Sequence, residues 1–436
     1  MTAADALKRR DPVAALDVGS DKVVCFVAHP DGTGDIRVIG VGTTRSTGLK
    51  GGVVVDMDAA EGAVRNAVSA AEEMAHTRIE QVILGISGPQ VRSLRVTAEV
   101  SVAGHAIQAA DIDQVIDSAS LNLRQAEERE GRESVPIHRF PTGFAVDGRN
   151  GVKDPTGMYG EALAVDVLLA TSAPGPVRNL RTVIERCHLD VESLVVTPYA
   201  SGLACLVPDE RDLGVTVIDM GGGTTSVAVF LGGQVLHTAV LPIGGRHVTN
   251  DIARGLTTPL AAAERLKTLY GLAVHAPSAE RELLEVPQIG EDEDGETNQI
   301  PRSMLTQIIR PRLEETFELV RDHLESQGLF ATAGRLVVLT GGASQLNGTR
   351  DVAAEILQRQ VRLGRPLNLK GVADAAAGPG FSACAGLLHY GLTDRPFDRG
   401  LERFRKTPLY GAPRAARTGR VTGRLGRLGQ WFRENF

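Results

Sequence analysis

The sequence has little cysteine, no long apolar run and no Walker-type phosphate-binding segment, and each absence excludes a class of protein. The four cysteines among 436 residues lack metal-ligand spacing, so we expect reduced, mostly buried thiols, as in a cytoplasmic protein. The ten histidines show no pairing and are interpreted as structural or surface residues. Without a Gly-x-x-x-x-Gly-Lys-[Ser/Thr] segment, P-loop chemistry is excluded.

Hydrophobicity is moderate and evenly spread. No apolar run reaches the length of a membrane-spanning helix, and residues 1–10 lack the apolar core of a signal peptide. Hydrophobic residues make up 42% of the chain, which suits a soluble globular protein. The length allows two large domains or several smaller ones with ample core.

One glycine-rich stretch organises the rest of the chain. Residues 215–230 combine a β-branched strand, a turn of three glycines and a second strand. At such a turn backbone N–H groups can approach an anion without Cβ clashes, and Asp219 could hold magnesium through water. Taken alone, the stretch could also be a hairpin with a flexible turn. The residues expected at the anion are Gly221, Gly222, Gly223, Thr224 and Thr225.

The same pattern opens the chain. Residues 16–19 align with residues 218–221, and a second strand follows in both copies. Two copies about half a chain apart indicate duplicated halves that face each other across a cleft. The residues of this copy expected at the anion are Asp17, Gly19, Ser20 and Lys22, the last a cation that the other copy lacks.

A third strand runs into a glycine turn at Gly341-Gly342-Ala343. Bare backbone there would let adenine and ribose lie flat on the protein. A single Gly-Gly after a strand is a weak signal, but three such turns in this order form a more specific constellation. Together they predict an α/β fold with two duplicated core domains around a nucleotide cleft.

With these motifs the chain resembles the actin-like ATPase superfamily, which includes actin, sugar kinases and heat-shock chaperones. The resemblance implies ATP and magnesium as ligands, with Asp17 and Asp219 holding the metal through water. Residues 197–204 and 380–388 resemble the two connecting helices, where small residues let the helices cross closely. The segment 263–267 resembles the family segment that approaches the ribose, through Glu264 and Lys267.

An α+β insertion, predicted at 81–165, interrupts the first half. Residues 91–102 alternate as a strand, and Asp111 is expected to cap a helix. Strand-like pieces at 138–145 and 163–169 complete the module. An insertion in this place resembles FtsA, the family of bacterial cell-division actin homologues. The alternative is an ordinary subdomain of the parent fold.

This resemblance predicts the order of the parts. They are a first core domain at 12–80 and 166–212, the insertion at 81–165, a second core domain at 213–244 and 333–392, a fourth subdomain at 245–332 with a helix at 303–324, a disordered linker at 393–419, and an amphipathic helix at 420–436. An acidic loop at 291–294 is expected on the surface of the fourth subdomain.

The C-terminal tail differs in charge from the body. The last 46 residues carry a net charge of +7 against −6 for the whole chain, so the body carries −13. Prolines and charge favour a disordered linker before residue 420. Beyond it, apolar residues share one helical face flanked by arginines, which is typical of an interfacial membrane helix. The residues expected at an anionic membrane are Val421, Arg424, Leu425, Arg427, Leu428, Trp431, Phe432 and Phe436.

Burying the large apolar side chains of this helix would contribute roughly 8–12 kcal/mol gross. Three glycines in the segment would each cost about 1 kcal/mol in a helix, so we expect helix formation only at a surface. The alternatives are a helix packed against the body, a polybasic nucleic-acid tail and an inert tail. The apolar stripe argues against nucleic acid, since phosphate binding needs only the charges.

The first functional hypothesis is an ATP-binding scaffold. By resemblance to FtsA it would polymerise on the inner face of the cytoplasmic membrane, as a peripheral protein, and tether the ring of the tubulin homologue FtsZ at the division septum. The fourth subdomain would capture the FtsZ C-terminal peptide, with Arg302 and Arg312 as candidate contacts, although a solvated helix face is the alternative for both. The insertion would meet later division proteins or a neighbouring subunit.

The second hypothesis is a small-molecule kinase of the same superfamily. It would need a polar substrate pocket with a general-base aspartate, for which no segment is evident, and it has no use for an amphipathic tail. A third is a pilus-assembly actin homologue, which carries a similar insertion but should lack this tail.

We predict firm ATP binding with at most slow hydrolysis. In related chaperones and rod-shape actins an acidic residue precedes the proline of the first connecting helix, and here that position is Thr197. Only Asp17 and Asp219 remain to order the attacking water. Single-turnover phosphate release measures this directly, and release at ordinary kinase speed would show the interpretation of Thr197 to be wrong.

Overall fold

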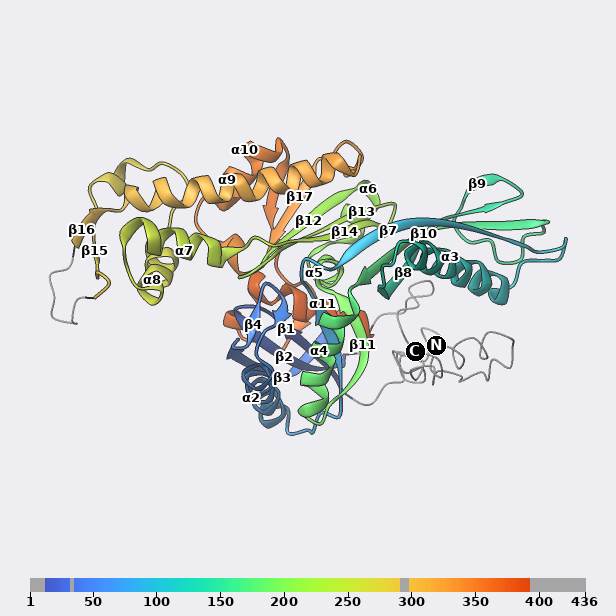
Figure 1. Cartoon of the computed structure of the whole chain (residues 1–436), viewed down its shortest axis with the longest axis horizontal. Coiled ribbons are helices and arrows are strands. Elements are labelled where there is room, and N and C mark those ends of the chain that lie inside the picture. Colours follow the sequence, from blue (N-terminus) through green and yellow to red (C-terminus); the bar gives the residue numbers. More distant parts are fainter. Residues whose placement is uncertain (1–11, 32–34, 291–297, 393–436) are drawn as a thin grey trace, which may run out of the picture. The chain divides into compact units, whose positions relative to one another are not determined.

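Two sheets of matching topology form the centre of the computed structural model, which describes residues 12–31, 35–290 and 298–392 (Figure 1). In each, three consecutive strands form an antiparallel meander, and two later strands add in parallel beside its first strand. The first has the order β11-β6-β1-β2-β3, with β1 (Val13–Val18), β2 (Lys22–Pro30), β3 (Ile36–Arg45), β6 (Gln81–Ile86) and β11 (Asp190–Val196). The second has the order β18-β17-β12-β13-β14, with β12 (Val215–Met220), β13 (Thr225–Leu231), β14 (Gln234–Leu241), β17 (Leu336–Thr340) and β18 (Gln360–Leu363). The predicted duplication is therefore confirmed.

The helix α2 (Met57–Ala75) covers β2 and β3 of the first sheet. Asp56 begins it by accepting the N–H groups of Asp58 and Ala59, as an N-cap does. Its buried alanines and valines lie so close to β3 that a Cβ on Gly42 would stand 1.8 Å from a backbone carbonyl oxygen of the helix. The helix α4 (Pro174–Arg186) packs beside α2.

The insertion forms a four-stranded sheet in the order β7-β10-β8-β9, covered by a long helix. Its elements are β7 (Arg92–Ser101), α3 (Ala109–Arg129), β8 (Val135–Val146), β9 (Arg149–Val152) and β10 (Ala162–Ser172).

Two boundaries differ from those expected at 81–165. The strand β6 lies in the first core sheet, because it pairs with β1 and β11, and β10 continues to Ser172. Asp111 is also not the cap of α3. The helix begins at Ala109, and the Asp111 carboxylate accepts the N–H of Gln108 from within the first turn, at 2.8 Å.

The end of the described chain returns to the first half. The short strand β19 (Leu369–Lys370) pairs in parallel with β3, and α11 (Ser382–Leu392) packs on β1, β2 and β6. The predicted second core domain, 333–392, therefore includes a last part that lies against the first sheet. There α11 crosses α5 (Thr197–Cys205), and these are the two connecting helices expected from the sequence.

The fourth subdomain is largely helical. Its elements are α7 (Gly245–Leu256), α8 (Leu260–Tyr270), α9 (Ser303–Ser326), β15 (Leu283–Val286) and β16 (Asn298–Pro301). The helix predicted at 303–324 is α9. The remaining elements are β4 (Leu49–Lys50), β5 (Val53–Val54), α6 (Pro208–Leu213), α10 (Thr349–Leu357) and the short 3-10 helices η1 (Pro277–Glu280), η2 (Gly342–Gln345), η3 (Asp374–Ala376) and η4 (Pro379–Phe381).

Three sequence predictions fall outside the described residues: the acidic loop at 291–294, the linker at 393–419 and the amphipathic helix at 420–436. Among the helices that are described, none has the length and apolarity needed to cross a membrane. All four cysteines are free thiols, and three of them are buried.

The insertion contacts both halves of the molecule. At its base His138 is fully buried, accepts the N–H of Val196 at 3.1 Å and packs edge-on against Tyr199 of α5 and Tyr390 of α11. At the start of β7, the Ser93 hydroxyl donates to the Thr238 carbonyl of β14 at 2.8 Å.

A histidine pair lies beneath this second contact. His237 of β14 is within 3.0 Å of the Ser93 hydroxyl, and its Nε2 is 2.9 Å from Nε2 of His323 on α9. Burial, together with the nearby His323 and Arg95, lowers the pKa of His237 from 6.5 to about 4. At neutral pH both rings are therefore neutral, and the N–H of one Nε2 donates a hydrogen bond to the other.

We predict that His237 makes the folded protein sensitive to acid. Between pH 6.5 and 4 the unfolded chain binds a proton at this histidine and the folded chain does not, so stability falls as pH falls through that window. The wild type should lose up to about 3 kcal/mol more unfolding free energy than His237→Gln between pH 7 and 4. Urea unfolding at several pH values measures this. His275→Gln, at a side chain that is 71% exposed, is the control, and equal pH slopes for wild type and His237→Gln would contradict the prediction.

Candidate functional site

The turns of the two hairpins, β1–β2 and β12–β13, face each other at close range. Each is closed by the same hydrogen bond, from the Gly19 N–H to the Lys22 carbonyl at 3.1 Å and from the Gly221 N–H to the Thr224 carbonyl at 2.9 Å. A Cβ on Gly223 would lie 2.6 Å from the hydroxyl oxygen of Ser20. The turns therefore approach so closely that only glycine fits at this point of the second one.

Two adjoining cavities lie at these turns, and they share Asp21, Gly222 and Gly342. The first is lined by both hairpin turns and by both strand-end aspartates. The second has a volume of about 320 Å³, within the range of about 300–1,000 Å³ that is usual for small-molecule sites. The residues of the first cavity include Asp17, Gly19, Ser20, Lys22, Asp219, Gly221, Gly222, Gly223, Thr224, Gly341 and Gly342.

Asp17 and Asp219 both line the first cavity. Burial, and then the charge of Asp219, raise the pKa of Asp17 to about 7, against the opposing effect of Lys22. Burial also raises the pKa of Asp219, while a hydrogen bond from Ser201 and the charge of Lys22 oppose that rise. The Ser201 hydroxyl donates to Asp219 Oδ2 at 2.5 Å. Two carboxylates close together in a half-buried site repel each other. A bound divalent cation would relieve that repulsion, so the residues present fit a magnesium ion.

Lys22 is the cation of the first hairpin. Its ammonium lies 3.5 Å from the ring centroid of Phe381, which immediately precedes α11. Burial lowers the pKa of Lys22, and the charge of Asp17 opposes that shift. A lysine held in this way beside a glycine turn suits a phosphate group.

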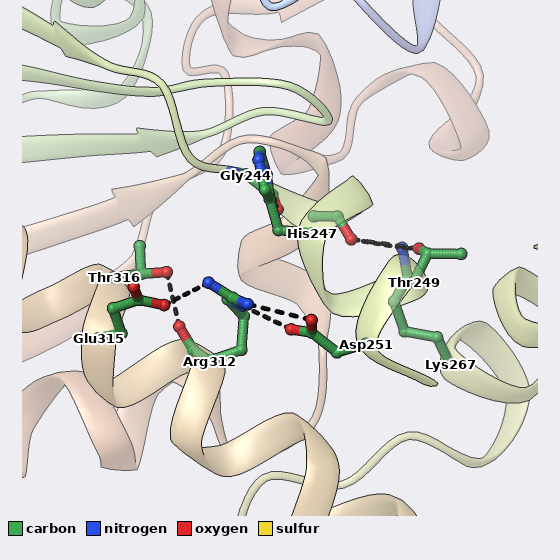
Figure 2. A network of polar contacts seen from close by, with 9 residues as sticks. Gly244, His247, Thr249, Asp251, Lys267, Arg312, Glu315 and Thr316 are labelled. Carbon is green, nitrogen blue, oxygen red and sulfur yellow. Dashed lines mark hydrogen bonds and ion pairs between the residues drawn. The ribbon is translucent and has the colours of Figure 1, made fainter. Parts of the chain in front are cut away.

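The second cavity joins α8, the start of α7 and the turn after β17. Lys267 donates to Glu264 at 2.7 Å, so the two residues predicted near a ribose are held together. Lys267 also donates to the Thr249 hydroxyl at 2.9 Å (Figure 2). Burial opposes ionisation of Glu264, but hydrogen bonds from Lys267 and Thr249 outweigh it and lower the pKa of that carboxyl. Ala343 lines this cavity as well.

The two glycines after β17 differ in their steric surroundings. Gly341 has a φ of 84°, and a Cβ there would lie 2.3 Å from Asp219 Oδ1 and 2.5 Å from the Met220 carbonyl oxygen. Nothing lies within 4 Å of a Cβ built on Gly342. Gly341 is therefore required by its neighbours in the protein, whereas Gly342 leaves open space in the cleft.

The structure brings most of the predicted residues together around the two cavities, but Thr225 lines neither cavity. The Thr225 hydroxyl donates to the Ile243 carbonyl at 2.8 Å and is fully buried, because alternate residues of a strand point to opposite faces. Ser226, one position further, lines the first cavity instead. Arg246 was not predicted either. It lines the second cavity and lies 3.8 Å from Asp21 of the other half.

The two arginines proposed for partner binding form ion pairs within the fourth subdomain. Arg302 contacts Glu282 at 2.8 Å and donates to the Tyr270 carbonyl at 2.8 Å. Arg312 donates to both carboxylate oxygens of Asp251 on α7, at 2.5 and 3.0 Å (Figure 2). Both side chains therefore have carboxylate partners already.

We predict that Gly342→Ala weakens ATP binding without loosening the fold. Its methyl would occupy open cleft space, so the unfolding temperature should not change, whereas ATP affinity should fall at least about tenfold, or 1.4 kcal/mol. A fluorescent ATP analogue and thermal unfolding without ligand measure the two effects. Gly62→Ala on α2, also in open space, is the control. Unchanged affinity in Gly342→Ala would place the nucleotide elsewhere.

Comparison with known proteins gives two matching family models. The model described as "Cell division protein FtsA" matches residues 216–386, and the model described as "SHS2 domain inserted in FTSA" matches residues 88–171. The second range coincides with the four-stranded sheet and α3. The second core sheet, the fourth subdomain and the inserted sheet thus lie within the matched residues.

Several solved structures share the fold. The PilM–PilN type IV pilus biogenesis complex aligns with a TM-score of 0.63 at 19% identity, covering 88% of this chain and all of that chain. MreB5 of Spiroplasma citri bound to ADP aligns with a TM-score of 0.50 at 15% identity, covering 87% of this chain and 96% of that chain. At such identities these structures show the actin-like ATPase fold alone.

Relatives of much higher identity extend over nearly the whole chain. The cell division protein FtsA of Agrobacterium fabrum is 41% identical over 440 residues, covering 98% of this chain and 96% of the relative. That of Pseudomonas aeruginosa is 36% identical, covering 87% and 89%, and that of Escherichia coli is 33% identical, covering 98% and 99%. The chain therefore belongs to the FtsA family of cell division proteins.

Proposed function

We propose that this protein binds ATP with magnesium in the cleft, polymerises on the inner face of the cytoplasmic membrane and tethers the FtsZ ring to it at the division septum. The observation that carries the proposal is the pair of facing hairpins with two half-buried carboxylates at their strand ends, in a chain of the FtsA family. Relatives over nearly the full length are cell division proteins, which favours this function over the kinase and pilus-assembly alternatives.

We expect the nucleotide to extend through both cavities, with its phosphates in the first and its ribose in the second. Asp17 and Asp219 would hold the hydrated magnesium, and the glycine turns with Lys22 would receive the phosphates. Glu264 and Lys267 would face the ribose. When bound, the metal neutralises charge on the phosphates and carboxylates, and the nucleotide then joins the two halves by contacting both.

Hydrolysis should be slow because, among the described residues of the cleft, only Asp17 and Asp219 remain to order the attacking water, and both are assigned to the metal. Thr197, at the start of α5, lines the first cavity where an acidic residue would be needed. A threonine hydroxyl does not accept a proton at neutral pH. We therefore propose that ATP acts here mainly as a structural ligand that favours subunit assembly.

Partner binding is assigned to two other regions. The fourth subdomain would capture the FtsZ C-terminal peptide, and Arg302 and Arg312 would meet a carboxylate of that peptide only by exchanging Glu282 and Asp251 for it. The inserted sheet would meet later division proteins or a neighbouring subunit. No role in nucleic-acid binding is proposed.

Membrane attachment is assigned to residues 420–436 from their sequence alone. The full chain should co-sediment with anionic vesicles in ATP and magnesium, and a chain ending at residue 419 should stay in solution, because the apolar face is lost. Sedimentation with phosphatidylglycerol vesicles, at several salt concentrations, measures this.

A matched variant separates apolar insertion from charge attraction. Leu428→Ser with Phe432→Ser keeps every charge of the tail but removes two large apolar side chains. We expect it to lose most vesicle binding, since each buried side chain contributes about 1.5–3 kcal/mol. If this variant sediments like the wild type, the tail is only a polybasic segment, and the membrane tether is wrong.

A further inference from the structure

The first connecting helix, α5, carries a polar line along one otherwise apolar surface. Eight of its nine residues are buried, and its sequence is TPYASGLAC. Thr197, Ser201 and Cys205 recur at every fourth position, so they lie one above another on the same face of the helix. A buried helix does not need such a line for packing, because each polar group must find a partner.

Each polar side chain of this line meets the cleft or the second half of the molecule. Thr197 lines the first cavity. Ser201 donates its hydroxyl to Asp219 Oδ2 at the end of β12. The Cys205 thiol lies 3.2 Å from the Ser382 hydroxyl and 3.6 Å from that of Thr340 at the end of β17. Asp219 and Thr340 are register partners on neighbouring strands, so α5 contacts both strand ends side by side.

Asp219 is held from two sides. Ser201 is fully buried and binds Oδ2, while Oδ1 lies against Gly341 closely enough that a Cβ there would be 2.3 Å away. Gly341 and Asp219 both line the first cavity, so the Oδ1 side of this carboxylate lies next to a cavity-lining glycine. Among the described residues no side chain donates a hydrogen bond to Asp17, so only one of the two carboxylates is oriented in this way.

We propose that Ser201 is a positioning residue for the magnesium–nucleotide site. Its hydroxyl fixes one oxygen of Asp219, so that the other stays turned toward the cleft for the hydrated metal. This inference rests on the proposed binding of ATP with magnesium. Without the hydroxyl, the carboxylate can rotate, and metal binding must then bear the entropy of ordering it.

The test compares ATP affinity of the full chain with magnesium and with EDTA. In Ser201→Ala, affinity in magnesium should fall about tenfold or more, the size of a hydrogen bond to a charged group, while affinity in EDTA should match the wild type. Ser201→Cys retains a weak donor and a similar volume, so its loss should be smaller. A fluorescent ATP analogue gives the four affinities, and thermal unfolding without ligand reports stability separately.

Cys205→Ala is the matched control. It removes a buried polar group from the same face of α5, but one that contacts hydroxyls and no carboxylate. It should change stability without changing the ratio of affinities in magnesium and EDTA. If Ser201→Ala and Cys205→Ala shift both affinities alike, Ser201 is only structural and the inference is overturned.

The outcomes also separate this inference from the proposed function. A wild-type chain that ignores ATP in both conditions refutes the proposed function itself. A wild type that binds ATP more tightly with magnesium, with a Ser201→Ala variant that keeps the full magnesium effect, refutes only the role of Ser201. If Ser201→Ala does not fold, Ser201→Cys carries the same comparison, and an unchanged magnesium effect there overturns the inference.

Discussion

The structure depends on a backbone contact between two helices. Where α5 and α11 cross, a Cβ on Gly386 would lie 1.7 Å from the carbonyl oxygen of Ala200, so no other residue can stand there without moving a helix. This approach brings the two halves close enough for their hairpin turns to meet, and it places Ser201 of α5 within hydrogen-bond distance of Asp219. The cleft, its carboxylates and its glycines all follow from a crossing that only a missing side chain permits.

The carboxylates of the cleft lower the free energy of unfolding of the ligand-free protein. Asp17 and Asp219 lie in a half-buried site, where burial and the charge of Asp219 raise the pKa of Asp17 because both disfavour its charged form. The large cores of the two sheets offset this cost, and a bound cation would remove it. A site that is costly when empty and relieved when filled couples ligand binding to the stability of the closed arrangement. This coupling is what a nucleotide needs in order to act as a structural part.

Local sequence patterns predicted the local features well, because hairpins and helices are decided by near neighbours. The two hairpins, α9 and the glycine turns follow from strand periodicity, turn glycines and helical spacing. Contacts between distant segments could not be predicted in this way. The return of β19 to β3, the pairing of β6 with β1 and the hydrogen bond of Ser201 to Asp219 depend on tertiary geometry. Thr225 lies away from the cavity for a simpler reason, since a one-residue shift along a strand reverses the face to which a side chain points.

The two anchors of the inserted sheet restrict how the cleft can open. His138 joins the sheet to the connecting helices, and Ser93 joins it to the edge of the second sheet. If one half rotates relative to the other, the inserted sheet cannot stay fixed to both. The rotation must then break the Ser93 hydrogen bonds to β14, unless the sheet deforms. The Thr238 amide donates to Ser93 at 3.1 Å, so its hydrogen-exchange rate would report how often the two halves separate. This amide lies outside the two cavities, so the rate would report opening without direct contact with a ligand there.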